Sequence, residues 1–130
     1  MLVGKHYKKN GYNCANFVAE WYEKHLNVNI PIINEFDRSF LVWMRRNFTD
    51  IKSPEEHCLV LMINLDGGYH IGVYHDYGVY HNYKPTIGYG SVVKWTIGSV
   101  NTYYSKVSYH KWLQSDITNQ QQLRNLKPIG

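Results

Sequence analysis

The sequence predicts an α+β fold in which N-terminal helices pack on an antiparallel sheet of about five strands. Before residue 49, two segments carry apolar side chains at the three- and four-residue intervals of amphipathic helices. After residue 57, short runs of β-branched and aromatic residues alternate with turn sequences, which is typical of an antiparallel meander. At 130 residues, of which 44% are hydrophobic, the chain is expected to form a single domain over residues 1–130.

Two helices are predicted in the first part of the chain. The first begins after Asn13, which is a suitable N-cap, and ends in the asparagine-rich stretch before Pro31. Its continuous face is formed by Cys14, Phe17, Val18, Trp21, Tyr22 and His25. The second helix is predicted over residues 38–48, and its packing face is formed by Phe40, Leu41, Met44 and Phe48.

Strands are predicted in the second part of the chain, over residues 58–65, 69–75, 79–83, 91–97 and 102–109. Turn sequences separate them, and residues 98–101 are expected to be the last of these turns. Cys58, at the start of the first strand, is expected to be an inert core residue. The polar segment 113–130 has weak periodicity and is predicted to be a surface helix or a loose tail.

Composition and charge exclude several classes of protein. The formal charge of +4 is spread along the chain, so nucleic-acid binding is not predicted. The apolar runs are too short to span a bilayer and the first residues lack a signal-peptide pattern, so we expect synthesis in the cytoplasm and no membrane span. The two cysteines follow no metal-ligand spacing, which favours free thiols and indicates no metal and no cofactor. The same argument assigns no ligand role to His6, His25, His57 and His110.

Cys14 is the candidate nucleophile. A helix N-terminus helps to lower the pKa of a thiol, and Cys14 lies at such a terminus. A nucleophilic thiol also needs a general base, and that base needs a polar group to orient it. His70 is the candidate base, because it shares a strand face with Gly72 and Tyr74, where the glycine is expected to leave open space.

The identity of the orienting group depends on the length of the turn after His75. A two-residue turn places His81 on the strand face of His70. A three-residue turn over residues 76–78 places Asn82 there instead. Either side chain can hydrogen-bond an imidazole, so both alternatives stay open. His75 itself lies near the turn and is expected to be exposed.

These motifs resemble those of a known family. "GYNCANFV", followed by "HIGVY" and "VYHN", resembles the NlpC-type cell-wall cysteine peptidases, which are papain-like and carry G-[FY]-D-C-[SW]-G-[FL]-V, HVGIY and FIHA. The opening "LVGKHY" is similar to the L-[IV]-G-x-P-[YF] segment of bacteriophage tail-associated members. The resemblance covers roughly residues 1–26 and 58–83.

The resemblance implies a papain-like fold and a thiol hydrolase. By its motifs, Cys14 would be the nucleophile, His70 the general base and His81 the orienting residue, with no cofactor. The implied reaction is cleavage of amide bonds in peptidoglycan stem peptides by an endopeptidase of a phage tail. Its partners would be the peptidoglycan peptide and other tail proteins, and its place the virion tail, with action in the host cell wall.

The chain also departs from the family pattern. Asn13 replaces an aspartate, and Ala15 and Asn16 replace the small residues that follow the cysteine. The family's upstream tyrosine aligns with Leu2, so Tyr7 and Tyr12 are the candidates for oxyanion or substrate contacts. These departures keep a non-catalytic structural or assembly component of a phage tail tip as an alternative. An antibacterial effector and a CHAP-like amidase share the same chemistry and are further alternatives.

Overall fold

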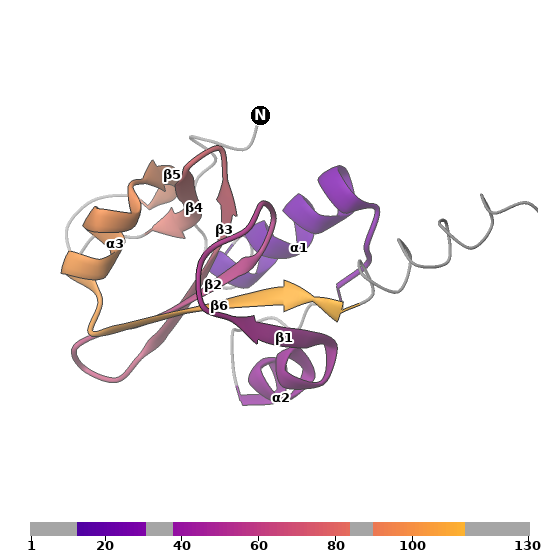
Figure 1. Ribbon diagram of the computed structural model, residues 1–130, viewed down its shortest axis with the longest axis horizontal. Coiled ribbons are helices and arrows are strands. Elements are labelled where there is room, and N and C mark those ends of the chain that lie inside the picture. Colours follow the sequence, from indigo (N-terminus) through magenta and orange to yellow (C-terminus); the bar gives the residue numbers. More distant parts are fainter. Residues whose placement is uncertain (1–12, 31–37, 84–89, 114–130) are drawn as a thin grey trace, which may run out of the picture.

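A computed structural model describes residues 13–30, 38–83 and 90–113, and Figure 1 shows the arrangement of their elements. In chain order these are α1 (Cys14–Leu26), α2 (Arg38–Asn47), β1 (Phe48–Ile51), β2 (Leu59–Ile63), β3 (Tyr69–His75), β4 (Gly78–Tyr83), β5 (Ser91–Trp95), α3 (Ile97–Tyr103) and β6 (Lys106–Trp112). The candidate contacts Tyr7 and Tyr12 and most of the predicted tail lie outside these residues. No helix in the described ranges is long and apolar enough to cross a membrane.

The strands form one antiparallel sheet in the order β1-β6-β2-β3-β4-β5. The predicted α+β class with an antiparallel sheet is therefore confirmed, with six strands in place of about five. In Figure 1, α2 lies beside the edge strand β1, and α3 lies near β4.

The start of α1 is fixed by reciprocal side-chain capping. The Asn13 side chain accepts hydrogen bonds from the backbone N–H groups of Ala15 and Asn16, at 3.0 and 3.1 Å. The Asn16 side chain in turn accepts from the Asn13 N–H at 3.1 Å, which completes a capping box. At the other end, Asn27 adopts the left-handed conformation with φ 54° and ends the helix. The predicted boundaries of this helix are confirmed.

The two faces of the sheet carry separate apolar clusters. On one face, Phe17 and Val18 of α1 are in the same buried cluster as Ile71 and Val73 of β3. On the other face, Val79 of β4 belongs to the cluster that contains Val100 of α3 and Tyr104. Because strand side chains alternate, His70, Gly72 and Tyr74 lie on the α3 side of the sheet, away from the packing face of α1.

Two parts of the predicted element pattern are wrong. The helix predicted over residues 38–48 ends at Asn47, and Phe48 begins β1, where it pairs with Trp112 and packs on its ring at 5.1 Å. The turn predicted over residues 98–101 is instead part of α3, so the last strand covers residues 106–112 and not 102–109. Tertiary contacts override weak local propensity at both places.

Candidate active site

The turn between β3 and β4 has two residues. His75 pairs with Gly78, and the intervening Asp76 and Tyr77 have φ angles of 47° and 62°. Two successive left-handed residues are typical of the tight turns that join antiparallel strands. This register places Gly72 opposite His81, and His81 is therefore on the strand face of His70.

His70 and His81 are joined directly. The Nε2 atom of His70 lies 2.8 Å from the Nδ1 atom of His81, and their rings meet at an interplanar angle of 75°. Only one of these two nitrogens can carry the shared hydrogen while the other accepts it.

The far nitrogen of His81 faces an aromatic environment. Its Nε2 atom is buried and has no hydrogen-bond partner within the part of the chain that the structure describes. The Trp95 and His81 rings meet in a T-shaped contact, with 4.7 Å between their centroids. A proton on His81 Nε2 would make His81 Nδ1 the acceptor and place the shared proton on His70 Nε2. His70 Nδ1 is then free to accept a proton.

Both histidines are neutral at pH 7. Burial lowers the pKa of His70 to about 4. Burial, together with the neighbouring His70, lowers the pKa of His81 to about 2. A general base must be unprotonated before the reaction, and the neutral histidine pair meets this requirement.

Asn82, the alternative orienting residue, serves a different part of the structure. It is fully buried, and the strand alternation places it on the face opposite to His81. Its Nδ2 donates a hydrogen bond to the backbone oxygen of Asn13 at 3.4 Å. Asn82 thus connects β4 to the start of α1.

Cys14 is the first residue of α1, and its side chain is only 7% exposed. Burial raises the pKa of the thiol to about 11, and the backbone N–H of Ile71 is the largest of the influences that oppose this rise. The backbone groups at the helix N-terminus, those of Cys14 and Ala15, also lower this pKa, but burial outweighs them in the resting protein. Ile71 directly follows His70, so the sulfur lies against the backbone next to the candidate base.

Cys14 and His70 are not hydrogen-bonded to each other. Among the described residues, the ring of His70 bonds to His81, whereas the sulfur of Cys14 interacts with the Ile71 N–H. The structure therefore joins the two histidines, whereas Cys14 belongs to the apolar cluster on the α1 side of the sheet.

Tyr104 is a site residue that the sequence reasoning missed. Its ring stacks on that of His70 at 5.9 Å with an interplanar angle of 14°, and it is 5% exposed. Burial raises the pKa of Tyr104 above its ordinary range. Tyr104 follows α3 directly, so its position became evident only with that unpredicted helix.

Gly72 does not leave the open space that we expected. A Cβ atom at this position would lie 2.6 Å from the backbone oxygen of Tyr80 and 2.9 Å from the Cβ of His81. The glycine is needed because the two strands approach closely beside the histidine pair.

Replacing Gly72 with alanine should therefore destabilise the protein and disturb His81. Because the obstructing atom belongs to the backbone, we expect a loss of about 1–3 kcal/mol in the free energy of unfolding. Urea denaturation measures this loss. Gly98→Ala is the control, because among the described residues a Cβ there would contact just the Thr96 hydroxyl, at 3.9 Å. Equal stability of Gly72→Ala and wild type would contradict the close approach.

The raised pKa of Cys14 predicts slow alkylation of the folded protein. At pH 7 a thiol with a pKa of about 11 is deprotonated in roughly one molecule in ten thousand. Iodoacetamide labelling should accelerate about tenfold per pH unit as the pH rises toward 11, since only the thiolate reacts. Peptide mass spectrometry separates Cys14 from Cys58, and denatured protein is the control. Labelling of folded Cys14 at pH 7 as fast as in the denatured chain would contradict the prediction.

The chain was compared with protein-family models, curated proteins and solved structures. None of the three comparisons gave a match.

Proposed function

We propose that the protein is a thiol hydrolase that cleaves amide bonds in peptidoglycan stem peptides, as a cell-wall endopeptidase of a phage tail. Cys14 is the nucleophile, His70 the general base and acid, and His81 the residue that positions His70. The observation that carries the proposal is the His70–His81 hydrogen bond, because with the shared proton on His70 Nε2 it leaves His70 Nδ1 to accept the thiol proton.

The reaction starts from a neutral thiol and a neutral imidazole. As the Cys14 sulfur attacks the amide carbonyl, its proton passes to His70 Nδ1, and the His81 contact stabilises the imidazolium that forms. His70 then donates this proton to the leaving amine. A water molecule, deprotonated by His70, hydrolyses the acyl-enzyme and restores the thiol.

The oxyanion is assigned to the backbone N–H of Cys14. The N–H groups of Ala15 and Asn16 already donate to the Asn13 side chain, so the cap uses these two donors of the first turn. The Cys14 N–H is not part of this cap and belongs to the attacking residue itself.

The substrate class rests on the motif resemblance, and an aromatic surface next to the histidines supports it. Tyr83 and Trp95 both contact the His81 ring, at 5.8 and 4.7 Å between centroids. Tyr103 packs on both of them and is 47% exposed. Amphipathic rings of this kind can contact a peptide stem or the sugar to which it is attached.

Digestion of purified peptidoglycan tests the proposal. The protein should release fragments that carry new amino groups and no new reducing sugar ends, because an amide bond and no glycosidic bond is cut. Amine labelling, reducing-end assays and mass spectrometry of the fragments give the two readouts. New reducing ends, or no release by folded protein over the pH range 5–9, would refute the proposal.

The second candidate is a non-catalytic component of a phage tail tip. The burial of Cys14 and its raised pKa favour it, since a thiol of this kind is unreactive at rest. This candidate forecasts that folded protein releases no fragments from peptidoglycan and still associates with other tail proteins.

A further inference from the structure

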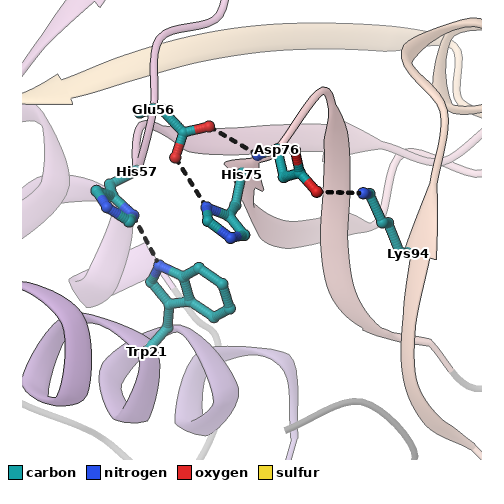
Figure 2. A network of polar contacts seen from close by, with 6 residues as sticks. All are labelled: Trp21, Glu56, His57, His75, Asp76 and Lys94. Atoms are coloured by element: carbon teal, nitrogen blue, oxygen red, sulfur yellow. Dashed lines mark hydrogen bonds and ion pairs between the residues drawn. The ribbon is translucent and has the colours of Figure 1, made fainter. Parts of the chain in front are cut away.

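A second cluster of polar side chains lies at the far end of β3 from His70. Glu56 and His57 precede β2, and His75 ends β3 (Figure 2). One ligand atom from each of these three residues lies within 4.8 Å of the others. Glu56 is exposed and the two histidines are half-buried, so the cluster is accessible from solvent. The expectation that His75 is exposed is therefore met only in part.

The backbone holds the cluster in place. The His57 N–H donates to the Tyr74 oxygen at 2.7 Å, and the Glu56 carboxylate accepts from the Asp76 N–H. Glu56 Oε2 also lies 2.8 Å from His75 Nδ1 (Figure 2). The rings of His57 and His75 are nearly parallel, with an interplanar angle of 7° and 5.7 Å between centroids. Anchoring of this kind fixes the donor atoms before any ligand arrives.

We propose that Glu56, His57 and His75 form a binding site for a divalent transition-metal ion of the zinc type. Two imidazoles and one carboxylate make a donor set that zinc accepts in a tetrahedral arrangement, with one position left for water or a further ligand. His25 is near enough to supply that ligand after a side-chain rotation, with its ring 5.8 Å from that of His57. Glu56 either binds the metal ion directly or orients His75 through their hydrogen bond, and both arrangements occur at zinc sites.

The hydrogen bond between Trp21 and His57 makes the Trp21 indole sensitive to metal binding at this site. The indole Nε1 donates to His57 Nδ1 at 3.2 Å (Figure 2), so this nitrogen now has no proton. A cation on Nδ1 would displace the indole, and a cation on Nε2 would require a proton on Nδ1, which also ends the bond. Metal binding must therefore change the environment of the Trp21 ring, which is 2% exposed.

The site is independent of the proposed hydrolase. Trp21 lies seven positions after Cys14 along α1, which corresponds to a rise of about 10 Å. A bound ion would join the segment before β2 to the β3–β4 hairpin, next to the C-terminal half of α1. The bound ion would stabilise this end of the fold, and its binding can be measured without peptidoglycan.

Zinc titration of the intact protein by calorimetry tests the site. We expect one zinc ion per chain, with affinity lowered at least about tenfold in Glu56→Gln and in His75→Gln. Glu55→Gln is the matched control, because this neighbouring carboxylate pairs with Lys111 at 3.5 Å and lies outside the cluster. His110→Gln is the control for loss of a histidine, since its ring bonds to Asp50 and Ser108.

Tryptophan fluorescence of the wild type gives a second readout that needs no variant to fold. Zinc should change the emission with the same midpoint as the calorimetric titration, and Trp21→Phe should lose that change while still binding zinc. Absence of saturable zinc binding would overturn the proposal. Equal zinc affinity of Glu56→Gln, His75→Gln and Glu55→Gln would overturn it as well, and so would binding that is lost only when Cys14 or Cys58 is replaced.

Discussion

Replacement of Cys14 with alanine is expected to lower the release of amino groups from peptidoglycan by at least about a thousandfold. In the proposed mechanism the sulfur is the atom that forms the acyl-enzyme, and among the described residues at the start of α1 no other side chain is a nucleophile of this kind. The side chain is small and lies at a helix end, so the fold should persist. Amine release from purified peptidoglycan measures the loss, and circular dichroism verifies the fold.

Cys58→Ala is the matched control for this experiment. Cys58 is also buried, at 2% exposure, and its pKa is likewise raised to about 11, but it belongs to the apolar cluster on the α3 side of the sheet. Its loss should leave the release rate within about twofold of wild type and cost only a little stability. Similar rates for the Cys14→Ala variant and the wild type would mean that another group performs the cleavage.

Replacement of His70 with glutamine is expected to lower the same rate by about a thousandfold. Glutamine can still hydrogen-bond to His81 but has no atom that accepts the thiol proton at pH 7. The initial rate of amine release at saturating peptidoglycan gives the effect on the chemical step. His110→Gln, which removes a histidine from another part of the sheet, should retain wild-type activity.

His81→Ala separates positioning from proton transfer. If His81 only orients His70, this variant should retain measurable activity and show a changed pH profile, because His70 loses a neutral acceptor for its Nε2 proton. A His70→Gln variant with an unchanged rate would remove His70 from the mechanism, whatever the result for His81.

The parts of the fold that depend on local sequence were predictable. Asn13 begins α1 because its side chain accepts the first free N–H groups, which is a property of a few adjacent residues. The alternation that places His70 and Gly72 on one face is equally local. The length of the turn after His75 could not be decided between two and three residues. Asp76 and Tyr77 both adopt left-handed angles although neither is a glycine, so the sequence does not mark the turn type.

The features that were missed depend on contacts between distant segments. α3 contains a glycine and β-branched residues, and it forms because Thr96 caps it and Val100 is buried against the sheet. Tyr104 reaches His70 only as a result of that helix. The burial of Cys14, which outweighs the helix terminus, is likewise a property of the packed molecule and not of its neighbours in sequence.

The cluster of Glu56, His57 and His75 was missed for a related reason. Ligand motifs are recognised by short, regular spacing, whereas these residues come from the segment before β2 and the far end of β3. Two backbone hydrogen bonds at Tyr74, to His57 and Cys58, and one from the Asp76 N–H to the Glu56 carboxylate join these segments, and the sequence does not reveal them.

The two-residue turn at Asp76 and Tyr77 limits how this protein can vary. One inserted residue would shift the register of β4 and exchange the places of His81 and Asn82, so both the histidine pair and the tie to α1 would be lost together. The same insertion would move the Asp76 N–H away from Glu56. Insertions should therefore be tolerated in the β2–β3 loop, where Leu65 is 88% exposed, and rejected at this turn.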